Sequence, residues 1–439
     1  MKLRQQKLCK MPRGRVRRKV ASALVLAMSA TTVFPAFAGP PPEGSDRYSW
    51  YIPSEDSGGL WHDEEDEDRE RIATDSDAEY ATWSNAVLTA MESFNSKVEF
   101  VDSEGKVLEG NTPDELSVPQ DEKNFPYLSQ QAGCTREDYG FSDTYEEHEY
   151  FLKGSANIYD IKDGKLATAS NAAKATSSNA QEEYVDRIIV FKPKDAADFS
   201  GVVFVDILNA SSKTDIASLW RQSYDYIMEK GAVYVGVTSK DVTVKSLKTF
   251  NQDRYAALKW GDDNGIFWDI LGQVGTLLKQ ENSPILYGED YSGDVNSYLF
   301  GSSQSGWYVN TFVNNFGLAN FVAEDAADLE TYEDYEDCVG SADHIFDGYL
   351  NFVGGMMDTS IAKKQSSKTR MFMPVKATDV PFILMVGEND YNPGPVRHDS
   401  DDPDNMYRHY VVAGGPHSDI IFPADPTDEL QMQTGRDTR

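Results

Sequence analysis

A short apolar stretch, Ser297–Phe300, runs directly into the small residues Gly301–Gly306, and a helical pattern follows without a break. A chain that passes from a strand into a helix within so few residues must turn sharply, and bulky side chains do not fit beside the apex of the turn. The serine at that apex, Ser303, is then presented at the edge of the sheet. The feature predicts a layered fold with Ser303 at the carboxyl end of a buried strand.

Strands and helices alternate along the chain from about residue 140. Apolar runs predict strands at 184–191, 201–208, 232–237, 297–300, 380–386 and 407–412, and helical spacing predicts helices at 216–230, 268–279 and 305–316. Strands that are apolar along their whole length are typical of parallel sheets covered on both faces. Right-handed crossovers bring the carboxyl ends of such strands to one edge. We therefore expect an α/β fold, with a mostly parallel sheet and helices on both faces.

Ser303 is the candidate nucleophile at this edge. Ser305 is the alternative, but the large side chain of Trp307 would then stand beside the apex of the turn. A serine hydroxyl is a weak nucleophile at neutral pH. It needs a base that takes its proton, a carboxylate that orients the base, and donors that bind the oxyanion. The sequence must therefore supply these three partners at the same edge.

The candidate base and acid lie late in the chain. His417 follows the last expected strand in the loop Gly414–Asp419, which leaves it free to lean over the sheet edge. Asp390 and Glu388 both follow the strand at 380–386, where an orienting carboxylate belongs. We favour Asp390, with Glu388 as the alternative. The order of serine, acid and histidine is that of α/β-hydrolase folds.

Two backbone amides are candidates for the oxyanion hole. The N–H of Gln304 should lie at the start of the helix that follows Ser303, where the helix dipole also favours negative charge. The second donor should come from the loop after the strand at 201–208, which begins with Asn209 and Ala210. Small polar residues in this loop allow the backbone to approach a substrate closely.

The first 38 residues have the pattern of a secretory signal peptide. Residues 1–19 carry nine Lys and Arg and no acid, an apolar run covers 20–34, and Pro35–Ala38 provides an A-x-A cleavage pattern. The alternative is a membrane anchor, but the apolar run is short for a span of about 20 residues. We expect cleavage after Ala38 and a secreted protein.

The remaining chain is predicted to contain one acidic N-terminal extension and one main domain. Residues 39–125 include a Pro-rich leader and the acid run 62–68, so we expect this extension to be partly disordered. The alternating strands and helices assign residues 126–439 to the main domain. The formal net charge of −31 excludes binding to nucleic acid or to anionic membranes by charge attraction. The pattern leaves the oligomeric state open.

Two cysteines, Cys134 and Cys338, remain once the signal segment is removed. They could form a disulfide in an oxidising compartment or stay as two buried thiols. No CxxC pair or His/Cys cluster indicates a metal site, and the serine chemistry above needs neither a metal nor a cofactor. No second apolar stretch is long enough to span a membrane.

Together these residues resemble a family of largely uncharacterised, secreted α/β-hydrolase-domain proteins with a G-x-S-Q-S-G turn. The matching stretches run in the family's order from about residue 145 to 419 and are Glu149–Ala156, Leu208–Ser211, Asp253–Tyr255, Gly301–Gly306, Phe346–Gly348 and Val412–Asp419. The resemblance implies an α/β-hydrolase fold and a serine hydrolase that cleaves carboxylic esters through an acyl-enzyme. It implies a small-molecule ester as substrate but does not say which one.

Two departures from the family pattern leave a second function open. Ser212–Thr214 stand where family members have a Gly-rich stretch, and the segment after His417, residues 418–439, is shorter than theirs. A shortened main domain could belong to a weakly active or inactive member that binds without catalysis. Transfer of the acyl group to another alcohol, or peptide cleavage, is a third option for the same fold.

Overall fold

The computed structural model describes most of the chain after residue 76. The described residues are 77–128, 143–162, 165–168, 181–261, 264–322, 343–361, 375, 380–390, 398–402 and 405–417. The expected signal segment 1–38, the acid run 62–68, Cys134 and Cys338 lie outside them, so cleavage and the disulfide stay predictions.

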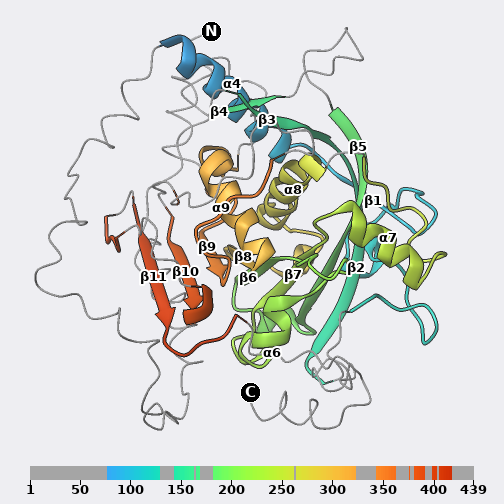
Figure 1. The fold of residues 1–439 in the computed structure, drawn as a ribbon. Coiled ribbons are helices and arrows are strands. Elements are labelled where there is room, and N and C mark those ends of the chain that lie inside the picture. The colour runs from blue at the N-terminus through green and yellow to red at the C-terminus, as the bar shows by residue number, and fades with distance from the viewer. Residues whose placement is uncertain are drawn as a thin grey trace, which may run out of the picture. The chain divides into compact units, whose positions relative to one another are not determined.

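A nine-stranded sheet forms the centre of the molecule (Figure 1), with the strand order β1-β2-β5-β7-β6-β8-β9-β10-β11. The strands are β1 (Glu99–Val101), β2 (Tyr145–Asn157), β5 (Gln181–Pro193), β6 (Val202–Ile207), β7 (Val233–Val237), β8 (Asn296–Ser302), β9 (Gly348–Phe352), β10 (Phe382–Gly387) and β11 (Tyr407–Val412). The six strands from β7 to β11 in this order run parallel, whereas β1, β2 and β5 are joined to their neighbours by antiparallel pairing. A separate hairpin consists of β3 (Tyr159–Lys162) and β4 (Lys165–Thr168). The predicted mostly parallel α/β sheet is confirmed.

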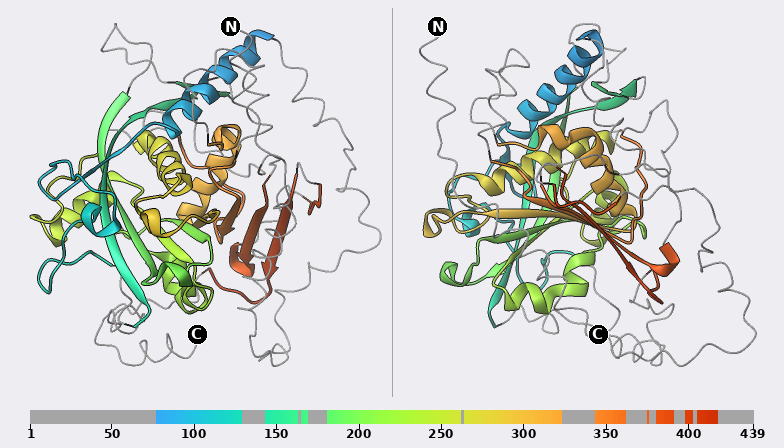
Figure 2. Two further views of the ribbon diagram at one scale, coloured as in Figure 1. Left: turned by 180° about the vertical axis from the view of Figure 1, so that it is seen from behind. Right: turned by 90° about the vertical axis from the view of Figure 1, so that its left-hand side faces the viewer.

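Helices cover both faces of the sheet, as expected (Figure 2). The helices are α4 (Asp77–Phe94), α5 (Pro113–Leu116), α6 (Ser218–Glu229), α7 (Asp241–Phe250), α8 (Phe267–Lys279) and α9 (Gln304–Phe316). One core joins α8, α9 and the second half of α4, and within it Trp268 stacks against Tyr308 and Phe316. A second core contains α6, whose Trp220 packs against Phe191 and Tyr234. Burial of these aromatic rings on both faces stabilises the sheet between them.

The elements before residue 126 belong partly to the same packed unit. The described residues from Trp83 onward fall within one compact unit. β1 pairs with β2 at the edge of the main sheet, and Met91 and Phe94 of α4 are fully buried in the core of α8 and α9. The division drawn at residue 125 from composition therefore falls inside the packed unit.

A buried network of charges joins the antiparallel side of the sheet to the loop after β6. The Glu149 carboxylate on β2 accepts hydrogen bonds from Arg187 Nε at 2.5 Å and from Arg254 Nε at 2.6 Å. Arg187 also donates through Nη1 to Asp215 Oδ2 at 3.2 Å, and Thr238 Oγ1 donates to the same oxygen at 2.5 Å. All four charged side chains are buried. The network fixes the far end of the loop that begins at Asn209.

We expect Glu149→Gln to lower the free energy of unfolding by about 3–5 kcal/mol, because it leaves two buried guanidinium groups without their shared carboxylate. Denaturant unfolding followed by tryptophan fluorescence measures the change. The control is Glu99→Gln, which removes a half-exposed partner of Lys153 and should cost less than about 1 kcal/mol. Equal losses in the two variants would contradict this role for the network.

Candidate active site

A strained turn carries Ser303 between β8 and α9. Ser303 has φ 55° and ψ −118°, a conformation that residues with a side chain rarely adopt. Its N–H donates to Phe352 O at the end of β9, at 2.8 Å. The sheet therefore holds the backbone of the turn on the side of β9, and the strain persists because the neighbouring strand supports it.

The small residues of the turn are required by close approach. A Cβ added at Gly301 would lie 2.2 Å from Ser305 O, so only glycine fits there. The Ser305 hydroxyl is buried and faces back into the turn, where it accepts from Ser302 N at 2.8 Å and donates to Ser302 O at 2.9 Å. Ser305, the alternative nucleophile, therefore stabilises the turn through these hydrogen bonds. Ser303 is the serine at the apex of the turn.

His417 lies beside Ser303, in the loop that follows β11. The Ser303 Oγ and His417 Nε2 atoms are 2.8 Å apart. The loop rests on the end of β10, because a Cβ added at Gly387 would lie 2.6 Å from both Gly415 O and Pro416 O. About half of the His417 side chain (49%) is exposed. The imidazole thus reaches over the sheet edge while one side of it stays open to solvent and to a substrate.

The structure separates the two candidate acids. Both lie in the short 3₁₀ helix Glu388–Asp390 directly after β10. Asp390 Oδ1 is 2.6 Å from His417 Nδ1, whereas Glu388 Oε2 accepts from Gly414 N at 2.6 Å. Asp390 therefore contacts the imidazole, and Glu388 holds the loop that carries it. The second oxygen of Asp390 is buried and has no hydrogen-bond partner among the described residues.

The three side chains form a continuous chain of contacts. A neutral imidazole can accept the Ser303 proton at Nε2 only while Nδ1 carries the other proton, and the contact with Asp390 favours that tautomer. The chain runs from the centre of the sheet, at β8, to its edge at β11. Ser303, His417 and Asp390, which the sequence places up to 114 residues apart, thus meet in one site.

The backbone N–H groups proposed for the oxyanion hole differ in whether they already have a hydrogen-bond acceptor. Gln304 is the first residue of α9, so its N–H has no acceptor within the helix. Asn209 and Ile216 exchange backbone hydrogen bonds, and the N–H of Asn209 donates to Ile216 O at 3.0 Å. The prediction that the Asn209 backbone N–H could bind an oxyanion is therefore wrong, because that group is already bonded. Ala210 is the loop amide that remains.

The side chain of Asn209 has a role that sequence reasoning missed. It is buried, and its Nδ2 donates to Ser302 O at 2.7 Å while its Oδ1 accepts from Ser211 N at 2.8 Å. One amide thus joins the turn that holds Ser303 to the loop that holds Ala210. An asparagine at the end of an apolar strand was the available signal, but the strand pattern alone does not show which backbone groups it meets.

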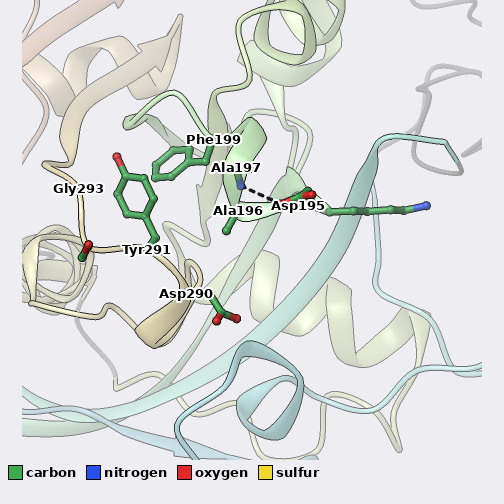
Figure 3. A pocket seen from close by; sticks show the side chains of 9 residues that line it. Asp195, Ala196, Ala197, Phe199, Asp290, Tyr291 and Gly293 are labelled. Atoms are coloured by element: carbon green, nitrogen blue, oxygen red, sulfur yellow. Dashed lines mark hydrogen bonds between the residues drawn. The ribbon is translucent and has the colours of Figure 1, made fainter.

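A hollow of about 830 Å³ lies at the amino ends of the parallel strands, away from the edge that carries Ser303 (Figure 3). It is lined by segments that precede β6 and β8, with the rings of Phe199 and Tyr291 side by side at 4.7 Å between centroids. Ser303 follows β8, so the hollow and the serine lie at opposite ends of that strand. The hollow is therefore separate from the candidate site.

Two further findings apply to the described part of the chain. It contains no group of three His, Cys, Asp or Glu side chains arranged to hold a metal ion. None of its helices combines the length and the apolar character that crossing a membrane requires.

Solved structures similar to this chain include several hydrolases. An alpha-beta serine hydrolase homologue from Coxiella burnetii is 10% identical, with 57% of this chain and 92% of that chain covered and a TM-score of 0.28. An α/β serine hydrolase without a lid from Xanthomonas campestris is 11% identical, with 57% and 87% covered and a TM-score of 0.27. Est1E from Butyrivibrio proteoclasticus is 8% identical, with 64% and 96% covered and a TM-score of 0.26. No protein of curated function matches the chain.

One family model matches most of the chain. The model of the family described as "Alpha/beta hydrolase domain" matches residues 111–439, which include the whole sheet except β1, together with Ser303, Asp390 and His417. With its mostly parallel sheet and its strand–serine–helix turn, the chain belongs to the alpha/beta hydrolase domain family.

Proposed function

We propose that this protein is a serine hydrolase that cleaves carboxylic esters through an acyl-enzyme on Ser303. The observation that carries the proposal is the 2.8 Å contact between Ser303 Oγ and His417 Nε2, continued by the 2.6 Å contact between His417 Nδ1 and Asp390. A non-catalytic member of the fold would not need these side chains within proton-transfer distance. The contacts therefore favour catalysis over binding alone.

In the first half of the reaction, Ser303 Oγ attacks the ester carbonyl carbon while its proton passes to His417 Nε2. The carbonyl oxygen becomes negative, and the N–H groups of Gln304 and Ala210 are the donors that would stabilise it. Asp390 keeps the imidazole in the correct tautomer and stabilises its positive charge. The C–O bond then breaks, and the alcohol leaves with the proton from His417.

In the second half, water takes the place of the alcohol. His417 accepts a proton from the water as its oxygen attacks the acyl-enzyme carbonyl. The second tetrahedral intermediate collapses, Ser303 regains its proton from His417, and the carboxylic acid is released. The exposed side of His417 supports this step, since water can reach the imidazole without movement of the sheet.

The buried Asn209 amide supports the geometry of the oxyanion hole. Its two hydrogen bonds fix the distance between the Ser303 turn and the Ala210 amide, and the Arg187–Asp215 contact fixes the other end of the same loop. Displacement of a catalytic group by about 1 Å can cost about 10²-fold in rate. We infer that Asn209 is a positioning residue for the oxyanion donors.

We further propose that the protein is exported by the signal segment 1–38. The nine basic residues, the apolar run and the Ala38 cleavage pattern support this proposal. The strongly acidic remainder suits a soluble extracellular enzyme, because a large net charge opposes self-association.

A fluorophosphonate probe should label the folded protein covalently, and Ser303→Ala should abolish the labelling. The probe reacts only with a serine hydroxyl that a base activates. Intact-mass spectrometry and in-gel fluorescence measure the outcome. Absence of labelling in folded wild-type protein would contradict the proposed function. Labelling that survives Ser303→Ala but disappears in Ser305→Ala would move the nucleophile to Ser305.

The two acids should differ sharply in their effect on turnover. Asp390→Asn should lower kcat for 4-nitrophenyl acetate by about 10⁴-fold, because an amide does not favour the required imidazole tautomer. Glu388→Gln is the matched control, since the amide oxygen can still accept from Gly414 N–H, and it should lower kcat far less. Steady-state kinetics of both variants decide the assignment, and the reverse order of effects would assign the role to Glu388.

Asn209→Asp should lower kcat by about 10-fold to 10²-fold with little change in KM, because it places a carboxylate oxygen against Ser302 O and moves the oxyanion loop. The matched control is Asn320→Asp. The Asn320 side chain is equally buried and also bridges two backbone groups, the N–H and the carbonyl of Phe346. Both variants should lose stability, and only Asn209→Asp should bind a trifluoromethyl ketone inhibitor more weakly.

If Asn209→Asp and Asn320→Asp lose activity in proportion to their loss of stability, Asn209 is not a positioning residue. Thermal unfolding monitored beside the kinetics separates the two effects. Retained affinity for the trifluoromethyl ketone in Asn209→Asp would contradict the positioning role independently.

A further inference from the structure

Lys240 is the third residue after β7 ends at Val237, so it lies at the same edge of the sheet as Ser303, which follows the parallel strand β8. Its neighbour Ser239 donates through Oγ to Leu208 O at 2.7 Å, which joins this segment to the loop that carries Ala210. The Lys240 ammonium lies 5.1 Å from the centroid of the Tyr308 ring on α9. Tyr308 lies about 7.5 Å along the helix axis from Ser303.

Two features disfavour a positive charge at this position. The side chain is partly buried, and burial lowers the pKa of Lys240 to about 8. Lys240 is the N-cap residue of α7 and makes no side-chain cap, although the positive end of the helix dipole lies there. A serine, threonine or aspartate at the N-cap would stabilise the helix. The lysine therefore occupies this place at a cost in stability.

The charge of Asp241 offsets that cost only in part, because it raises the pKa of Lys240 less than burial lowers it. The neighbouring carboxylate, Asp241, forms its ion pair with Lys245 at 2.8 Å, and no described carboxylate forms an ion pair with Lys240. The ring of Tyr308 supplies a cation–π contact, which is weaker than a buried ion pair. Tyr308 is itself packed against Phe267 and Trp268, so the ring is held in a fixed position below the ammonium. The ammonium thus lies over this ring and forms no ion pair with a carboxylate of the described residues.

A residue that breaks local rules of stability at the sheet edge that carries a candidate catalytic centre is expected to serve the ligand. We propose that Lys240 binds a carboxylate of the substrate, so that the enzyme acts on esters that carry a second, ionised carboxyl group away from the scissile bond. This inference rests on the proposed function of Ser303. It adds a substrate class, because the negative charge of the ligand would complete an ion pair that the described part of the chain leaves open.

The experiment compares matched esters that differ in one charge. On the acyl side, 4-nitrophenyl hemisuccinate and hemiglutarate are compared with the neutral 4-nitrophenyl 4-methylpentanoate. On the alcohol side, 4-acetoxybenzoate is compared with its methyl ester. We expect wild-type protein to prefer the charged ester in one of the two series, with at least a tenfold higher kcat/KM.

Lys240→Met keeps the length of the side chain and removes its charge. It should lower kcat/KM for the preferred charged ester at least tenfold and that for its neutral partner less than twofold. Lys240→Arg should retain the preference. Lys248→Met, in the last turn of the same helix and bonded only to Ala256 O among the described residues, is the control and should leave both esters unaffected.

The outcomes separate the inference from the function on which it rests. Loss of fluorophosphonate labelling in wild-type protein would overturn both. Hydrolysis of the neutral esters without any preference for a charged one would overturn the role of Lys240 alone. An equal loss on charged and neutral esters in Lys240→Met would show a structural role and would overturn it as well.

Discussion

The turn at Ser303 is the constraint around which the rest of the site is arranged. A residue with a side chain adopts φ 55° there, and this conformation is unfavourable in an isolated chain. It persists because β8 lies in the middle of the sheet, because Gly301 lets Ser305 O approach, and because Phe352 O receives the Ser303 N–H. The sheet, Gly301 and Ser305 thus hold Ser303 at the sheet edge, where His417 contacts it.

The strands and helices with strong apolar patterns could be predicted from the sequence. The strands found as β5, β6, β7, β8, β10 and β11, and the helices found as α6, α8 and α9, lie where hydrophobic spacing places them. The apolar pattern does not predict β2, because acidic residues interrupt it. One of them, Glu149, is buried between two arginines. β9 was missed because it is short and carries the polar Asn351.

In the candidate site, too, the sequence predicts some features and not others. The positions of Ser303, His417 and Asp390 at strand ends could be predicted, since parallel strands bring their carboxyl ends to one edge. The sequence favours Asp390 but leaves Glu388 open, because both follow the same strand and only the loop geometry separates them. The bonded N–H of Asn209 was likewise hidden, since the bridge to Ile216 joins residues that no periodicity relates.

The loop of His417 is fastened to the end of β10 at three places. Glu388 holds Gly414, Asp390 holds His417, and the bare backbone of Gly387 lies against Pro416. Among the described residues, this loop is linked to the nucleophile by the hydrogen bond between His417 and Ser303. Acid and base therefore share one support at the end of β10. Their position relative to each other is set by that strand end and not by the nucleophile, so the imidazole is already aligned when Ser303 gives up its proton in the proposed reaction.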